Sequence, residues 1–240
     1  ITSIWGGDQM IVGPYISIPF LDPITVTNED GSKTVSYSRK NLYVLPEVLD
    51  GEVDIVPENR SLGIYEAIVY EGDMKFSGKF VLPDFATLGI QEKYIEWNKA
   101  AVNMGVTDLR GVEGSVDFTW NDEVLEMNSG LSSTEIYPSG IHASVFIEKD
   151  KEYNFNMSST LRGSNSFSVV PFGKQTRFSM NSPWQEPSFK GSYATAAYTP
   201  ANDGFTAAWE VSHLNRNYPQ AWSGRKYNPT VDFFGTEFIQ

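Results

Sequence analysis

Apolar and polar residues alternate along much of this chain, and this period of two restricts the fold more than any other feature of the sequence. The stretch LGIYEAIVYEGDMKFSGKFVL, residues 62–82, holds two such runs. Alternation of this kind is typical of strands that bury one face and expose the other. We expect the two runs to form a hairpin that turns at Glu71-Gly72-Asp73.

Turn signals divide the rest of the chain into further strands. Asp-Gly pairs, which tolerate positive φ, lie in NEDGSK (28–33) and ANDGF (201–205) and predict two tight hairpins. Residues 142–180 are expected to form three or four consecutive antiparallel strands, which would make a meander. Three turn-like tripeptides separate these strands: Lys149-Asp150-Lys151, Gly163-Ser164-Asn165 and Pro171-Phe172-Gly173.

One segment carries a helix signal. Within residues 84–100, Asp84 can cap an N terminus, and residues from Leu88 to Lys99 recur at spacings of three and four. Gly89 weakens this helix because glycine lowers helix propensity. We therefore expect one or two short helices around 84–100 in a fold that is mainly β, an antiparallel β-sandwich or meander.

Composition limits the classes of protein. With 240 residues, 40% of them hydrophobic, residues 1–240 can form a single β-rich domain, divided near 84–105 if there are two lobes. The net charge of -12 disfavours nucleic acid as a partner, because Lys and Arg must neutralise phosphates. The chain has no cysteine, so disulfides and thiolate metal sites are excluded, and no cofactor is expected. It begins at Ile1 and has no run of 18 apolar residues, so we expect a piece of a longer protein.

Catalytic signatures are sparse. His142 and His213 are isolated, without the spacing of a metal-ligand set, and neither a nucleophile elbow nor a glycine-rich phosphate loop occurs. The acidic clusters are expected in solvated turns: Asp50, Glu52 and Asp54, and Asp122 with Glu123. The sequence therefore predicts a protein that is not an enzyme, with no catalytic or metal-binding residues.

Aromatic residues are the only functional hint in the composition. The stretch NSPWQEPSFKGSY, residues 181–193, holds a tryptophan, a phenylalanine and two prolines. Trp184 and Trp222 lie among turn-forming residues, where a ring is harder to bury. We interpret Trp184, Pro187, Phe189 and Trp222 as a candidate recognition surface. For residues 181–193 a packed corner between sheets is favoured over that role, with Trp184 and Phe189 covering the end of the sandwich.

Five long blocks of sequence carry a family resemblance. LRGSNSFSVVPFGKQTRFSMNSPWQEPSFKGSY (161–193) precedes GFTAAWEVSHLNRNYPQAW (204–222). Upstream, in order, are WGGDQMIVGPYISIPF (5–20), RSLGIYEAIVYEGDMKFSGKF (60–80) and MGVTDLRGVEG (104–114). Together they resemble the CreD family, bacterial inner-membrane proteins associated with cell-envelope integrity, over nearly the whole chain.

The resemblance implies an extracytoplasmic domain that faces the periplasm and has been cut from its membrane anchors. Its partners would be its own transmembrane helices and an envelope protein or glycan, and Ile1 and Gln240 would be neighbours near the membrane. Three functions stay open. The first is a non-catalytic domain that acts through contacts, the second is a glycan- or lipid-binding module, for which the aromatic residues are the motive, and the third is an envelope hydrolase with paired carboxylates.

Overall fold

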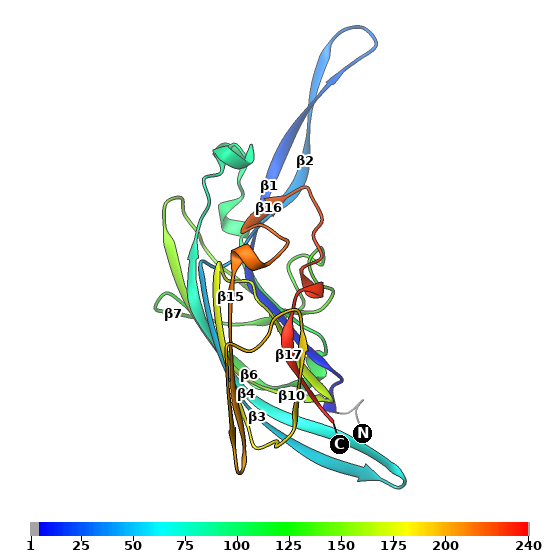
Figure 1. Ribbon diagram of the computed structural model, residues 1–240. Helices are drawn as coiled ribbons and strands as arrows, with labels where there is room; N and C mark the ends of the chain where they lie inside the picture. The colour runs from blue at the N-terminus through cyan, green and yellow to red at the C-terminus, as the bar shows by residue number, and fades with distance from the viewer. Residues whose placement is uncertain (1–4, 240) are drawn as a thin grey trace.

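Two β-sheets packed face to face build the molecule (Figure 1). The computed structural model describes residues 5–239, except the side chain of Leu62. Sheet A contains β1 (Gln9–Thr27), β2 (Lys33–Val44), β5 (Ala101–Val106), β8 (Asn128–Ser129), β9 (Gly140–Ser144), β11 (Ser166–Val170), β13 (Pro187–Gly191), β16 (Ala221–Ser223) and β17 (Phe234–Phe238). Sheet B contains β3 (Val48–Leu62), β4 (Tyr65–Val81), β6 (Val112–Trp120), β7 (Glu123–Leu125), β10 (Glu152–Ser164), β12 (Gln175–Ser182), β14 (Ala197–Ala201) and β15 (Gly204–Ser212). The helical elements are single 3-10 turns: η1 (Ala86–Leu88), η2 (Glu92–Tyr94), η3 (Trp97–Lys99), η4 (Leu109–Gly111), η5 (His213–Asn215) and η6 (Pro229–Val231).

Both sheets mix parallel and antiparallel pairs. The order is β13-β17-β11-β1-β5-β9-β8 in sheet A, where β2 joins β1 to β16, and β14-β15-β12-β3-β4-β10-β6-β7 in sheet B. Strand β1 runs parallel to β11, and β3 runs parallel to β12. The predicted β-sandwich is therefore confirmed, while the two parallel pairs depart from a purely antiparallel arrangement.

Aromatic rings from both sheets fill the space between them. Trp209 on β15 is 1% exposed and stacks on Phe234 of β17, with ring centroids 5.1 Å apart. Phe178 on β12 contacts the same two rings, at 6.3 Å from Trp209 and 5.5 Å from Phe234. Because these rings come from opposite sheets, their contact holds the sandwich closed.

The hairpin predicted at Glu71-Gly72-Asp73 is wrong, because β4 runs straight through these residues. A Cβ on Gly72 would lie 3.2 Å from the side chain of Val53 on β3, so this glycine makes room for packing and not for a turn. The chain turns instead at Gly63, whose φ of 65° suits the tight connection between β3 and β4.

The predicted meander over residues 142–180 is also wrong, although the chain breaks near the expected tripeptides. The four strands β9, β10, β11 and β12 alternate between sheets A and B, so no two of them pair with each other. Asn165, with φ of 60°, reverses the chain between β10 and β11. The two Asp-Gly hairpins are confirmed, as β1–β2 and β14–β15.

The helical expectation over residues 84–100 is met by three separate 3-10 turns, η1 to η3. The Asp84 carboxylate accepts a hydrogen bond from the backbone N–H of Ala86 at 3.0 Å, as a cap does. Gly89 adopts a left-handed conformation with φ of 73° and ends the first turn, so no continuous helix forms.

Two hairpins project from the body in different directions (Figure 1). At one end is the arm, residues 21–39 of β1 and β2, and near the other end is the β3–β4 hairpin. The described ends of the chain meet near the β3–β4 hairpin, since Gly7 O accepts from Ser164 N at 3.0 Å and Phe238 N donates to Asn165 O at 2.7 Å. The predicted neighbourhood of Ile1 and Gln240 concerns residues outside the described range.

A buried tyrosine lies near this meeting point, and its ionisation is expected to lower the stability of the fold at alkaline pH. The Tyr70 hydroxyl donates to Ser166 O at 2.6 Å, and complete burial, followed by the charge of Asp8, raises the Tyr70 pKa well above its usual value. A raised folded pKa means that the stabilisation is present below the unfolded pKa and is lost as pH rises above about 10.

We therefore expect the unfolding free energy of the wild type to fall more steeply above pH 10 than that of Tyr70→Phe, by about 1.4 kcal/mol per pH unit. Urea titrations of both proteins across alkaline pH would measure the two slopes. Parallel slopes would show that Tyr70 ionises as readily in the folded chain as in the unfolded one.

Candidate functional site

The four predicted surface residues fall in two places. Trp184, Pro187 and Phe189 lie together at β13, where Pro187 pairs with Phe238 and the Trp184 ring contacts the Phe238 ring at 6.0 Å. Trp222 lies on β16, which pairs with β2 below the arm. The expectation that its ring is hard to bury is wrong, because Trp222 is 6% exposed.

Strand β13 covers one edge of the sandwich. The half-buried Phe189 ring meets Phe205 and Trp209 edge-on, at 5.7 and 5.6 Å. Pro187 begins this strand and does not end pairing as expected, because an edge strand tolerates a missing N–H. A Cβ on Gly191 would lie 2.0 Å from Phe233 O, so the expected close approach at this glycine is present. The recognition role of this edge stays a prediction.

The arm is a long, exposed β-ribbon. Ile24 and Val26 lie on one of its faces and Val35 and Tyr37 on the other, each between 45% and 53% exposed. Among the described residues, 21–27 pair only with β2, so both outer edges of the ribbon keep unpaired backbone groups. Free edges and apolar side chains on both faces suit the arm to contact with another molecule.

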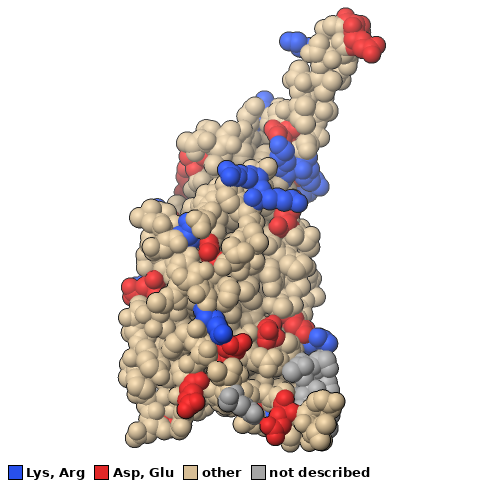
Figure 2. Space-filling view, turned by 45° about the vertical axis from the view of Figure 1, so that its right-hand side comes forward, with Lys and Arg blue, Asp and Glu red and all other residues tan. Residues whose placement is uncertain are grey.

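Cationic side chains gather beneath the arm (Figure 2). The antiparallel pairing of Ser223 with Leu42 carries the following residues back along β2 toward the arm, so Gly224 lies beside Lys40. We call the resulting group the basic cluster, and it comprises Arg39, Lys40, Arg225 and Lys226. Adjacent basic pairs at 39–40 and 225–226 are visible in the sequence, but only the strand register brings them together.

Half of the basic cluster is neutralised by carboxylates and half is not. Arg39 pairs with Glu96 at 2.7 Å, and Lys40 pairs with Asp22 at 2.5 Å. Arg225 lies over the Tyr227 ring, 5.1 Å from its centroid. Neither Arg225 nor Lys226 has a carboxylate partner within residues 5–239, so this surface attracts anions although the whole chain carries a charge of -12.

The base of the arm is held in place by a buried arginine. Arg216 is 7% exposed, and its Nη1 donates to the carbonyls of Pro171, Phe172 and Gly173 at 2.9, 2.7 and 2.9 Å. Its Nη2 donates to Gln220, whose backbone oxygen accepts from Leu45 N. Burial lowers the Arg216 pKa, because the surroundings disfavour its charge. Arg216 thus fixes the segment that leads into β16.

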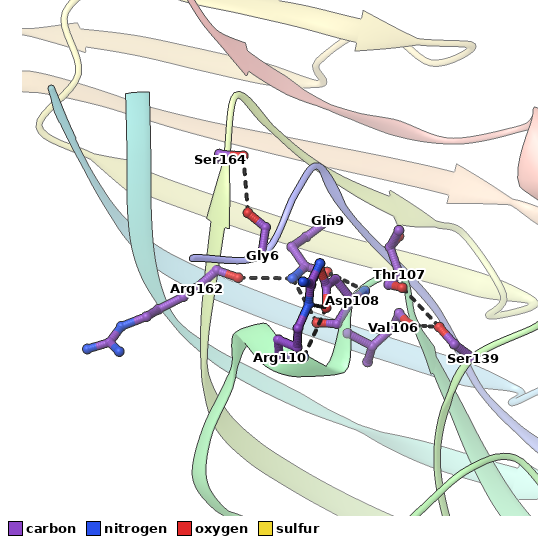
Figure 3. A network of polar contacts seen from close by, with 9 residues as sticks. All are labelled: Gly6, Gln9, Val106, Thr107, Asp108, Arg110, Ser139, Arg162 and Ser164. Atoms are coloured by element: carbon purple, nitrogen blue, oxygen red, sulfur yellow. Dashed lines mark hydrogen bonds and ion pairs between the residues drawn. The ribbon is translucent and has the colours of Figure 1, made fainter. Parts of the chain in front are cut away.

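A second polar network joins the start of β1 to the η4 turn and to β10 (Figure 3). Gln9 is 1% exposed, and its Nε2 donates to Asp108 O at 3.0 Å and to Arg162 O at 2.9 Å. Its Oε1 accepts from Asp108 N at 3.1 Å, while the Asp108 carboxylate binds Arg110, whose hydrogen bonds lower the Asp108 pKa. Every side-chain group of Gln9 has a partner, so this network is a structural joint.

The same region holds the side chain of Trp5 in place. Trp5 lies between two guanidinium groups, 5.2 Å from Arg60 on β3 and 4.7 Å from Arg162 on β10. Arg162 in turn pairs with Glu71 and Glu113. Residues from four blocks that carry the family resemblance therefore meet here: 5–20, 60–80, 104–114 and 161–193.

A trough on the outer face of sheet B collects carboxylates. Its volume is about 510 Å³, and Asp50, Glu52 and Asp117 line it. The expectation that Asp50 and Glu52 lie in turns is wrong, because both belong to β3, near its start. Asp50 pairs with Arg177 at 2.7 Å and Glu52 pairs with Lys75 at 3.1 Å, so cations already neutralise two of the three groups.

Comparison with known proteins identifies relatives. A family model described as "Inner membrane protein CreD" matches residues 1–240. The inner membrane protein CreD of Escherichia coli K12 is 31% identical over 216 residues, which cover 88% of this chain and 46% of that protein. The chain thus spans about half the length of this curated relative. Among residues 5–239, no helix is long and apolar enough to cross a bilayer.

Solved structures resemble the chain only weakly. A proposed nutrient-binding protein from Legionella pneumophila has a TM-score of 0.38 at 9% identity, and the match covers 88% of this chain and 72% of that one. An M1 zinc metallopeptidase variant from Deinococcus radiodurans also has a TM-score of 0.38, at 6% identity, covering 82% and 42% of the two chains.

Proposed function

Because the chain belongs to the CreD family of inner membrane proteins, we propose that it is the periplasmic domain of a cell-envelope protein and acts by binding a partner, without catalysis. The end where Gly7 and Phe238 meet Ser164 and Asn165 faces the membrane in this proposal, next to the protein's own transmembrane helices. The arm then points away from the membrane, toward other components of the envelope.

The observation that carries the proposal is the arm together with the basic cluster. Ile24, Val26, Val35 and Tyr37 supply apolar contacts, and the basic cluster, which follows β16 beside Lys40, supplies two cations without a carboxylate partner among the described residues. An apolar ribbon above a cationic base suits a partner that combines an apolar strand or groove with acidic groups.

A glycan-binding module is the second candidate, and the trough on sheet B favours it. Asn156, Thr119 and Ser77 line the trough beside the carboxylates, and such groups can bind sugar hydroxyls.

A hydrolase, the third candidate, would have to act in the same trough. Its support is weaker, because Asp50 and Glu52 are both neutralised by cations.

Charge reversal below the arm tests the leading candidate. We expect Arg225→Glu with Lys226→Glu to weaken capture of a partner from envelope extracts about ten-fold, the equivalent of ~1.4 kcal/mol, and wild-type capture to weaken with added salt. Lys149→Glu with Lys151→Glu makes the same charge change in an exposed turn and serves as the matched control.

The arm itself requires a second variant. Ile24→Ser with Val26→Ser replaces the apolar side chains on one face of the arm with polar ones and should release the same partner that charge reversal releases. If both variants retain every partner that the wild type binds, the arm is not the contact surface. A glycan retained by both but lost from Asn156→Ala would favour the trough.

A further inference from the structure

The tip of the β3–β4 hairpin carries the most exposed large apolar side chain of the described residues. We define the hairpin tip as residues 60–66. Within it, Ile64 is 90% exposed and Tyr65 is 73% exposed. Farther along the same hairpin, Val56 is 56% exposed. Exposed isoleucine at the end of a projecting hairpin favours contact with an apolar phase.

The position of the hairpin tip is as informative as its composition. The hairpin projects past both ends of the described chain (Figure 1). Arg60 lies over Trp5, 5.2 Å from the ring centroid, so the tip is fixed to the segment through which the chain enters the fold. Any neighbour attached to both ends of this chain lies next to the hairpin tip.

The chemistry of the hairpin tip suits the boundary of a bilayer. Arg60 pairs with Glu58 at 2.6 Å, so these charges neutralise each other, and the arginine stem can lie along lipid while its head stays in water. Tyrosine is enriched at the membrane–water interface, and isoleucine is stabilised by transfer into hydrocarbon.

We propose that the hairpin tip contacts the lipid bilayer, with Ile64 in the outer acyl region and Tyr65 among the headgroups. The inference rests on the orientation in the proposed function, and it does not depend on the arm's partner. Two observations select lipid as the occupant: both chain ends lie at this side, and the curated relative, of which this chain spans 46%, is an inner membrane protein. The hairpin then sets the distance and tilt of the domain above the membrane.

The absence of cysteine makes a direct test possible, because one introduced thiol is the only labelling site. Ile64→Cys is labelled with an environment-sensitive fluorophore, and the chain is held on vesicles of phosphatidylethanolamine and phosphatidylglycerol by an N-terminal histidine tag bound to a chelating lipid. We expect a blue shift of the label emission and loss of quenching by aqueous iodide, both reversed when imidazole releases the chain.

A matched control comes from the other hairpin. Val35 in the arm is also an apolar residue on an exposed ribbon. The emission of a label on Val35→Cys should not change when vesicles are added. A label on Tyr65→Cys should shift less when Ile64→Ser is added, because the isoleucine drives the contact. Val35, Ile64 and Tyr65 are all exposed, so these variants are expected to keep the fold.

The possible outcomes separate the two proposals. If the labels at positions 64 and 35 both fail to respond to vesicles, the hairpin tip does not contact lipid. The proposed role of the arm is unaffected by that result. If only the label at position 35 responds, the arm faces the bilayer, and both the tip contact and the orientation in the proposed function are wrong. An equal response to vesicles at both positions would also overturn the tip contact.

Discussion

Trp209→Ala is expected to lower the free energy of unfolding by about 3–5 kcal/mol, the usual cost of truncating a buried tryptophan. The ring is 1% exposed, stacks on Phe234 from the opposite sheet and contacts Phe178. Removing it leaves a cavity between the two sheets, since the surrounding rings can close only part of the space. Urea denaturation followed by circular dichroism would measure the loss.

Two further variants make this result specific. Trp209→Phe should recover more than half of the loss, because the indole N–H of Trp209 has no hydrogen-bond partner among the described residues. Leu214→Ala removes a residue that is 82% exposed, and its effect should stay within about 0.5 kcal/mol. A loss below ~1 kcal/mol for Trp209→Ala would mean that the sheets are not held together by this cluster.

Arg216→Met is expected to cost about 2–4 kcal/mol, because three buried hydrogen bonds are lost and the Phe172 carbonyl is left without the donor that Arg216 supplies. Methionine keeps much of the volume of the side chain and removes the cost of burying a charge, which limits the loss. The exposed Arg225→Met is the control and should leave stability nearly unchanged.

The same change should affect the base of the arm more than the rest of the chain. Without Arg216, the segment that leads into β16 is no longer fixed, so amide exchange should accelerate at Leu45, whose N–H donates to Gln220 O. Partner capture should weaken as it does for charge reversal of Arg225 and Lys226. Unchanged exchange at Leu45 in a folded Arg216→Met protein would contradict the positioning role of Arg216.

Local signals in the sequence were sufficient where the structure depends on a few adjacent residues. The Asp-Gly pairs at 30–31 and 203–204 both form hairpins, because positive φ is required at those turns. Gly72 misled the prediction, because its role depends on the side chain of Val53 on another strand. The meander failed for the same kind of reason, since the sheet that each strand joins is decided by distant partners.

The candidate site divides in the same way. The sequence singled out Trp184 and Phe189, which lie along the same edge because they are close in the chain, although their rings contact different partners, Phe238 and Phe205. It grouped them with Trp222, which is buried at the base of the arm. The basic cluster could not be assembled from the sequence, because Lys40 and Arg225 meet only through the pairing of β2 with β16.

The parallel pairing of β1 imposes an order on how the molecule is assembled. β1 can pair early with β2, but Gln9 pairs with Phe167, so the first residues of β1 gain their neighbour β11 only after residues 166–170 have emerged. The hairpins β1–β2 and β3–β4 need only local contacts and can form early, while the chain is still being delivered. Until β11 arrives, the edge of β1 at Gln9–Val12 lacks that neighbour in the completed sheet, and this open edge is exposed to aggregation during that interval.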